Sequence, residues 1–193
     1  AASAPSATCS RATPTEPLAT RLLIRPAVAD DLPAITALYS REVDERVATY
    51  EYVAPDEVEM TRRWRGIVDQ GFPYFIAELD GRFAGYAYAS SYRTREGYRW
   101  TVEDTVYIEP WAQGQGVGRG LLQRLIDECQ ALGFRQMVAV IGDVSNSASI
   151  ALHERLGFRT VGVFAGLGRK HGRWLDTVQM QLALDPGANA EPE

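Results

Sequence analysis

The chain has 193 residues, with 20 basic side chains against 25 acidic ones and a formal net charge of −5. This length allows one domain with a sizeable core, and the acidic balance argues against a general nucleic-acid-binding protein, because phosphate backbones are held mainly by Lys and Arg. No apolar run approaches the roughly 18 residues that a membrane helix needs, so neither a membrane nor a nucleic acid is expected as a partner.

The first segment, residues 1–20, is rich in Ala, Ser, Thr and Pro and lacks large apolar side chains. Such a composition cannot bury enough surface to fold, and the apolar region of a secretory signal is missing. We interpret it as a disordered leader or an expression remnant, with a transit peptide as the alternative. One folded domain is predicted over residues 21–185, followed by a flexible tail at 186–193.

The first half of the domain is predicted to contain a strand, two helices and a hairpin. Asp30 or Asp31 can cap the first helix, and Pro33 fits its first turn. Asp80-Gly81 is a strong turn signal between two apolar, aromatic segments. The expected bounds are residues 21–27 for the strand, 30–47 and 55–71 for the helices, and 72–93 for the hairpin.

The second half alternates between strands and helices. A polar, aromatic link leads to a strand at Thr105–Glu109, and a glycine-rich loop then leads to a helix from about Gly116 to Leu132, whose apolar residues keep helical spacing. The expected bounds of the remaining elements are 135–142 for a strand, 145–157 for a helix, and 158–170 and 172–184 for a closing pair of strands. This order predicts an α/β domain with one mixed sheet.

Cysteine, histidine and lysine are scarce. Cys9 and Cys129 form no disulfide framework, and His153 and His171 lie far from both, so no metal-ligand spacing exists. A cytoplasmic, metal-free protein is therefore expected. Lys170 is the only lysine, which leaves arginine as nearly all of the positive charge. Arginine suits bidentate binding of carboxylates and phosphates, although genome composition also produces such a bias.

The glycine-rich loop at residues 113–119 runs straight into a helix. The first turn of a helix carries unpaired N–H groups and the positive end of the helix dipole, and glycines remove Cβ atoms that would keep an anion away. The loop therefore predicts a phosphate site. It lacks the Gly-Lys-Ser/Thr of a P-loop, and Arg119 or Leu121 stands where the dinucleotide fingerprint needs its third glycine. A glycine-rich turn without a ligand is the alternative.

The remaining pattern is Gln/Arg-x-x-Gly-x-Gly/Ala, with Gln113, Gly116 and Gly118, and it resembles the pyrophosphate loop of the GNAT acyltransferases. The segments YRWTVEDTVYIEP, RQMVAVIGDVSNSASIALHERLGF and KHGRWLD are similar, in order and spacing, to the phosphinothricin and methionine sulfoximine or sulfone acetyltransferase branch. The match covers about Leu23 to Leu184. It implies a GNAT fold with a mixed, centrally splayed sheet flanked by helices, acetyl-CoA as donor, a small L-amino-acid analogue as acceptor, and a homodimer.

The resemblance also implies a general base. Acetyl transfer requires a free amine, and in this branch the glutamate at the position of Glu103 is the proposed base, acting directly or through a water. Its neighbour Asp104 would point to the opposite face of an extended chain, so only one of the two is expected to face the cleft. An ordinary surface carboxylate is the alternative for Glu103.

The cofactor is expected to lie along the strand and the loop. By resemblance, backbone atoms of Val106 and Ile108 hold the pantetheine arm, and the N–H of Val106 polarises the thioester carbonyl. Plain sheet pairing is the alternative. The complete set of expected cofactor-binding residues is Val106, Tyr107, Ile108, Gly114, Gln115, Gly116, Val117, Gly118, Arg119 and Asn146.

Two residues of the helix predicted at 145–157 have double interpretations. Asn146 is a good N-cap and, by resemblance, a contact of the CoA arm, and both can hold through different atoms. His153 stands where many GNAT proteins place a tyrosine that protonates the leaving thiolate. It is a candidate catalytic residue, and a satisfied helix histidine is the alternative.

The aromatic link carries the candidate acceptor site. Arginines can bind a carboxylate bidentately, and aromatic rings can line an apolar stem, so Arg93, Tyr98 and Arg99 are the candidate substrate-binding residues. Basic residues between aromatic ones also occur in nucleic-acid sites, but the acidic net charge of the protein argues against this. Any single arginine can also be a solvated surface charge.

A non-catalytic acetyl-CoA sensor is the alternative function, although a sensor has no need of a base at Glu103.

Overall fold

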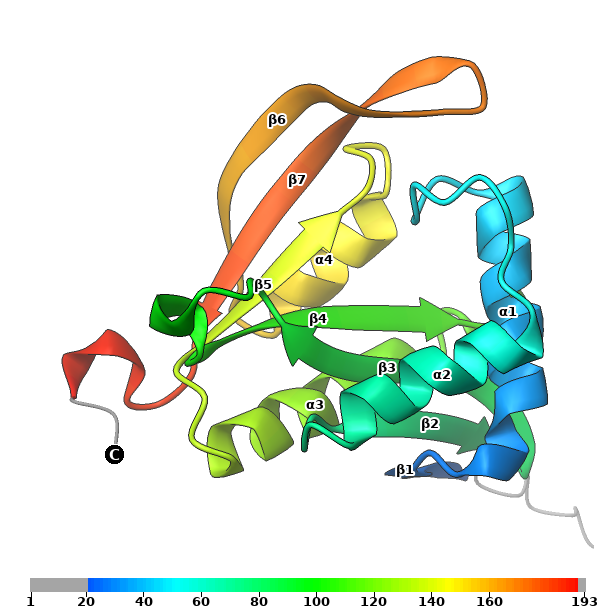
Figure 1. Cartoon of the computed structure of the whole chain (residues 1–193), viewed down its shortest axis with the longest axis horizontal. Coiled ribbons are helices and arrows are strands. Elements are labelled where there is room, and N and C mark those ends of the chain that lie inside the picture. The colour runs from blue at the N-terminus through cyan, green and yellow to red at the C-terminus, as the bar shows by residue number, and fades with distance from the viewer. Residues whose placement is uncertain (1–20, 191–193) are drawn as a thin grey trace, which may run out of the picture.

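The computed structural model describes residues 21–190, so the expected leader and the last three residues of the expected tail lie outside the described range. The elements follow one another in the predicted order, as Figure 1 shows. The strands are β1 (Leu22–Pro26), β2 (Tyr74–Leu79), β3 (Arg82–Ser91), β4 (Thr101–Ile108), β5 (Gln136–Ile141), β6 (Arg159–Lys170) and β7 (Arg173–Ala183). The α-helices are α1 (Leu32–Glu45), α2 (Glu57–Val68), α3 (Val117–Ala131) and α4 (Ser147–Arg155).

The strands of the described range form one sheet in the order β1-β2-β3-β4-β5-β7-β6. The β4 and β5 strands run parallel, whereas the other neighbours run antiparallel, so the predicted mixed sheet is confirmed. A parallel pair needs a crossover connection, and here the glycine loop and α3 provide it. The loop therefore lies at the carboxyl end of β4, which is where open α/β sheets bind ligands.

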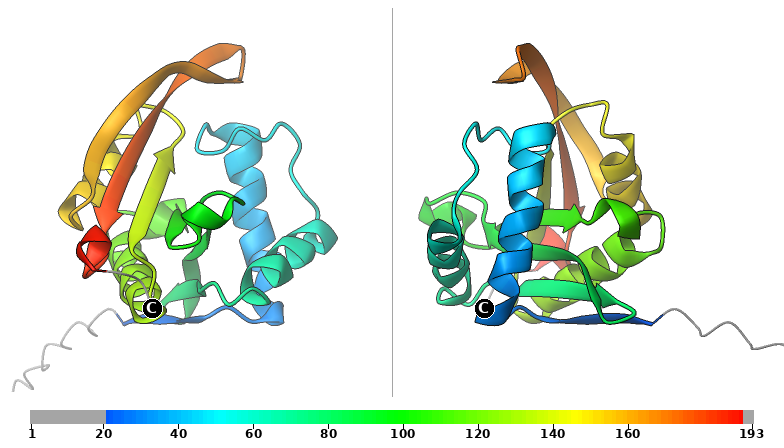
Figure 2. Two further views of the ribbon diagram at one scale, coloured as in Figure 1. Left: turned by 60° about the vertical axis from the view of Figure 1, so that its left-hand side comes forward. Right: turned by 90° about the vertical axis from the view of Figure 1, so that its right-hand side faces the viewer.

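Helices α1 and α2 cover one face of the sheet, and α3 and α4 cover the other (Figure 2). Successive side chains of a strand point to opposite faces. On β3, Tyr86 packs in the α1 core while Ala87 packs in the α3 core. On β4 the same alternation sends Val102 to the α3 core and Tyr107 to the α1 core. Each face of β4 therefore serves a different layer.

The predicted start of β4 at Thr105 is wrong, because the strand begins at Thr101. Charged residues are depleted in strands, so the local signal is weak over Glu103 and Asp104. Pairing with β3 on one side and β5 on the other stabilises this segment as strand. Glu103 therefore lies inside the central strand, between β3 and β5, and not in a preceding loop.

The hairpin of β6 and β7 extends beyond the body of the sheet and arches over α4 toward the end of α1 (Figures 1 and 2). Its pairing shifts register at Thr160/Gly162 and at Phe164/Gly168, and such bulges bend a ribbon. After β7, the residues Gly187–Asn189 of the expected tail form a short 3-10 helix.

Within residues 21–190, no helix combines the length and apolar character needed to cross a membrane.

Candidate active site

The β4 and β5 strands are paired over only about half of the length of β4 and then diverge. They pair from Thr101 and Gln136 up to Asp104 and Ala139, although β4 continues to Ile108 and β5 to Ile141. A gap therefore opens in the middle of the sheet, as a centrally splayed sheet requires.

The backbone of β4 faces this gap at alternate residues. Tyr92 N–H donates to the carbonyl of Thr101, and Glu109 N–H donates to the carbonyl of Ala84, with an unbroken β3–β4 register between them. In an antiparallel pair every second residue directs both backbone groups to the same neighbour, so odd-numbered residues of β4 bond to β3. The N–H and C=O groups of Val106 and Ile108 consequently point away from β3, toward the gap, where the Ile108 carbonyl accepts from Nε2 of Gln113 at 3.4 Å.

A cleft of about 250 Å³ occupies the gap. Its lining comes from residues 48–50 between α1 and α2, residues 103–107 of β4, residues 139–142 at the end of β5, and Asn146, Ser149 and His153 of α4. The structure thus brings together predicted residues that lie far apart in sequence.

Glu103 is half-buried and faces the α1 side of the sheet together with Thr105 and Tyr107. Burial raises the pKa of its carboxyl, and the negative charge of Asp104 raises it further, while the positive charge of Arg93 opposes both. A carboxylate with a raised pKa in a cleft is a stronger base than an exposed one. Its surroundings differ from those of a surface carboxylate.

Asp104 points to the opposite face, where it contacts His153. The Nε2 atom of His153 lies 3.0 Å from Oδ2 of Asp104, and Nδ1 lies 2.7 Å from the carbonyl of Ser149. The side chains of His153 and Asp104 are only 4% and 2% exposed. Both ring nitrogens face acceptors, so an imidazolium that donates twice satisfies them both.

The pKa of His153 reflects this pairing. Burial lowers the pKa, but the hydrogen bond and charge of Asp104, together with the Ser149 carbonyl, outweigh it and leave the pKa raised. The other oxygen of Asp104, Oδ1, is buried without a protein partner. Neither ring nitrogen is free to donate into the cleft, which agrees with the alternative interpretation of His153 as a satisfied helix histidine.

The glycines of the loop have distinct roles. Gly114 and Gly116 have φ angles of 74° and 84°, a left-handed conformation that suits glycine. Gly118 is different: a Cβ there would meet the Leu152 side chain at 3.3 Å, so this glycine allows α3 to pack against α4. Only the first two shape the open loop. The exposed face of the loop presents the unpaired N–H groups of the α3 N-terminus.

The flanking loop residues contribute through their backbone. Val117 is buried and Arg119 is exposed, so the side chain of Val117 belongs to the core and only its amide can meet an anion. The Gln115 amide group donates to the carbonyl of Trp111 at 2.7 Å, which holds the loop in position. Tyr107 packs edge-on against Tyr39, with ring centroids 5.5 Å apart, and its backbone bonds to β3. The expected role of Tyr107 in cofactor binding is therefore limited to lining the cleft.

Asn146 caps α4, because its side-chain oxygen accepts from the N–H of Ser149 at 3.2 Å. This confirms the N-cap interpretation. The residue also lines the cleft, so its amide nitrogen remains available for a ligand contact.

The aromatic link does not bring all of its predicted residues together. Arg93 and Tyr98 line a surface recess with Tyr92, Thr94 and Arg95. Tyr98 packs edge-on against Tyr92 with ring centroids 5.8 Å apart.

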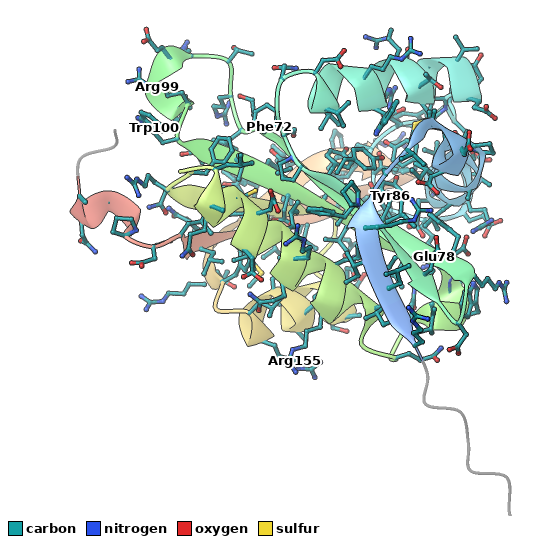
Figure 3. The ribbon with its side chains drawn as sticks, turned by 90° about the horizontal axis from the view of Figure 1, so that it is seen from below. Phe72, Glu78, Tyr86, Arg99, Trp100 and Arg155 are labelled. Atoms are coloured by element: carbon teal, nitrogen blue, oxygen red, sulfur yellow. The ribbon has the colours of Figure 1, made fainter. Side chains whose placement is uncertain are left out.

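Arg99 lies elsewhere. It pairs with Glu96 at 2.9 Å and stacks over Trp100 at 4.8 Å, and Figure 3 shows Arg99 beside Trp100 at the edge of the molecule. A 3-10 turn at Glu96–Tyr98 rotates the chain, and this turn separates Arg99 from the recess.

Sequence reasoning missed Arg95 and the segment of residues 48–50. The segment carries no periodic pattern, and only the tertiary structure places it next to the end of β5. One signal was available: the connection between α1 and α2 is longer than the roughly 2–8 residues usual between helices, and long connections are often functional.

Among the described residues, no group of three or more His, Cys, Asp or Glu side chains is arranged to hold a metal ion.

Comparison with known proteins adds to this geometry. The family model described as the Acetyltransferase (GNAT) family matches residues 35–158. The phosphinothricin N-acetyltransferase of Alcaligenes faecalis is 51% identical over 85% of this chain and 83% of its own length. The L-methionine sulfoximine/L-methionine sulfone acetyltransferase of Pseudomonas aeruginosa is 40% identical over 86% of this chain and 97% of its own.

A solved structure agrees with these relatives. The crystal structure of a GNAT superfamily phosphinothricin acetyltransferase from Sinorhizobium meliloti in complex with AcCoA superposes with a TM-score of 0.86 at 48% identity. The match covers 89% of this chain and 93% of that one.

The Asp104–His153 pair generates a testable prediction. Asp104→Asn should lower the pKa of His153, because it removes the negative charge that outweighs burial. An NMR titration of the two histidine rings measures this, with exposed His171 as the internal reference. An unchanged pKa of His153 would contradict the pairing.

The same substitution should affect stability with a definite pH dependence. A raised folded-state pKa stabilises the protein fully below the unfolded histidine pKa of ~6.5 and loses this effect as the pH rises through the folded value. Asp104→Asn should therefore cost more unfolding free energy at about pH 5.5 than at about pH 9, as measured by urea denaturation.

Proposed function

Because the chain belongs to the GNAT family of acetyltransferases, we propose that it transfers an acetyl group from acetyl-CoA to the α-amine of a small L-amino-acid analogue. The acceptor is of the phosphinothricin, methionine sulfoximine or methionine sulfone type, as in the names of the relatives. One observation carries the proposal: Glu103, a half-buried carboxylate with a raised pKa, lies where β4 leaves β5.

Acetyl-CoA supplies the activated acetyl group as a thioester. Its pyrophosphate binds the amides from Gln115 to Arg119, where the positive end of the α3 dipole and the open glycines favour an anion. Its arm follows the even-numbered backbone of β4 that faces the gap, and the amide nitrogen of Asn146 is a further donor or contact. The N–H of Val106 then stabilises the negative charge that develops on the thioester oxygen.

Glu103 removes the proton from the acceptor ammonium, directly or through a water. Its raised pKa reduces the difference in pKa between the Glu103 carboxyl and the acceptor ammonium, which makes proton transfer less unfavourable. Asp104 contributes to that pKa through its negative charge, and His153 fixes the position of Asp104. The engaged ring nitrogens favour a positioning role for His153 over direct proton donation.

The acceptor carboxylate binds at the recess of Arg93 and Arg95, with Tyr98 as an aromatic wall. The charge of Arg93 already acts on Glu103, so a carboxylate bound there places the neighbouring amine toward the base. Arg99 is the weaker candidate, because Glu96 already pairs with it.

We predict that Glu103→Gln loses turnover by roughly 10²–10⁴-fold while acetyl-CoA affinity changes little, because the substitution keeps the shape and removes the proton acceptor. Thiol release from acetyl-CoA, followed across a panel of L-amino-acid analogues, measures the first quantity, and calorimetry measures the second.

Turnover of Glu103→Gln within threefold of the wild type would remove Glu103 from the mechanism. Wild-type protein that binds acetyl-CoA but releases no thiol with any acceptor would instead support the sensor function.

We predict that Arg93→Ala raises the acceptor KM by about one to two decades, since a hydrogen bond to a charged group contributes roughly 1.5–3 kcal/mol. The acetyl-CoA KM should stay nearly unchanged. Arg99→Ala is the matched control, because it removes the same charge from the same link outside the recess. An acceptor with a carboxamide in place of its carboxylate should lose affinity for the wild type but much less for Arg93→Ala. If the carboxamide costs the same affinity in the wild type and in Arg93→Ala, then Arg93 does not bind the acceptor carboxylate.

We also propose that the protein forms a homodimer and is cytoplasmic, the latter because its cysteines form no disulfide framework. Apolar side chains on the β6–β7 hairpin support self-association, because large exposed apolar patches mark interfaces. They are Val161, Val163, Phe164, Leu167 and Trp174, each 48% exposed or more. Sedimentation equilibrium should give twice the chain mass, and Trp174→Arg should shift it toward the monomer. A wild-type monomer at micromolar concentration would contradict the dimer.

A further inference from the structure

Lys170, the only lysine of the chain, is buried at the tip of the β6–β7 hairpin with 1% of its surface exposed. Its ammonium donates to the carbonyl of Thr49 at 2.8 Å and lies 3.4 Å from the carbonyl of Glu42. Burial lowers its pKa, and the charges of Glu42, Asp44 and Glu51 oppose this. A buried cation needs such partners.

These carbonyls belong to the end of α1 and to the segment that follows it. The Glu42 carbonyl lies in the last turn of α1, at the negative end of the helix dipole, which a cation stabilises. It accepts from the Arg46 N–H as well as from Lys170. The next hairpin residue, His171, places Nε2 3.2 Å from the carbonyl of Arg46. The hairpin tip therefore holds the segment that leaves α1 through its backbone.

The same segment is held at Tyr50. The hydroxyl of Tyr50 donates to the carbonyl of Gly142 at 2.5 Å and lies 2.6 Å from Oγ1 of the buried Thr177 on β7. A Cβ on Gly168 of β6 would stand 2.5 Å from the Tyr50 ring, and one on Gly142 would stand 2.5 Å from the carbonyl of Val47. Both glycines are needed for this close approach.

The segment held in this way forms a wall of the active-site cleft. Ala48, Thr49 and Tyr50 line the cleft opposite β4. They lie on the α1 side of the sheet, the side that Glu103 faces, whereas Val106 and Asn146 direct their groups to the gap and to α4. The held wall is therefore next to the base and the acceptor amine, not along the path of the donor.

We propose that the β6–β7 hairpin is a strap that fixes the acceptor-side wall of the cleft, and that Lys170 is the positioning residue through which it does so. The inference rests on the proposed acceptor site at Glu103. Lys170 does not touch the acceptor. It sets the position of residues 48–50, and so the affinity for the acceptor and the size that the cleft admits.

Lys170→Met tests the strap, because methionine fills the buried space without the ammonium. The acceptor KM should rise about tenfold, as expected for a lost charged hydrogen bond, while the acetyl-CoA KM changes less than twofold. The acceptor KM should rise less for longer acceptors than for short ones, because a wall that is no longer fixed can move to admit a longer molecule. Arg169→Ala is the matched control, because it removes a neighbouring exposed charge and leaves its backbone carbonyl, to which the Tyr52 hydroxyl donates.

Hydrogen exchange provides a readout that needs no substrate. Amides of residues 46–52 should exchange faster in Lys170→Met than in the wild type or Arg169→Ala, while those of α3 are unchanged. If Lys170→Met does not fold, Tyr50→Phe loosens the same segment from the other side and should give the same selective changes.

Two results would overturn the strap: unchanged exchange at residues 46–52 in a folded variant, or equal rises of both KM values. The proposed function fails in a different way. Wild-type protein that acetylates no amino-acid analogue would refute the acceptor class, while the exchange data would still decide whether Lys170 holds the wall.

Discussion

The separation of β4 from β5 after Asp104 and Ala139 is the constraint on which the remaining features depend. A continuous sheet would pair every backbone group of β4 and leave no cleft. Because β5 turns away, the backbone groups of Val106 and the N–H of Ile108 have no strand partner on that side, while the Ile108 carbonyl accepts from the Gln113 side chain. Unpaired backbone groups are costly to bury unless a ligand or water pairs with them. The parallel direction of the two strands also places the glycine loop and the α3 N-terminus at the open end of the gap.

The alternation of side chains along β4 divides the chemistry between the two faces. Glu103 faces the α1 layer, where the wall of the acceptor site is formed, and Asp104 faces α4. Their charges still interact through the strand, since Asp104 raises the pKa of Glu103. His153 keeps that buried charge paired. A neutral residue at position 104 would therefore change the base without touching either substrate.

The hairpin and the α1–α2 connection complete the cleft from outside the central strands. They stabilise one another through backbone carbonyls, a buried ammonium and Gly168, whose missing Cβ permits close contact with Tyr50, while Gly142 after β5 permits the approach of Val47. Contacts to backbone carbonyls, together with the hydroxyl of Tyr50, fix the position of this wall.

The sequence alone determined the order of elements, the mixed sheet and the glycine loop, because periodicity, turn residues and helix-start signals are local. The family resemblance, carried by contiguous motifs, pointed to acetyl transfer and to Glu103. Tertiary structure decided what depends on partners. Pairing on both sides extended β4 to Thr101, the carboxylate of Asp104 engaged His153, and a 3-10 turn directed Arg99 away while Arg95 lined the recess. Lys170 contacts Thr49 although the two residues are 121 positions apart in the sequence. No local pattern encodes such a contact.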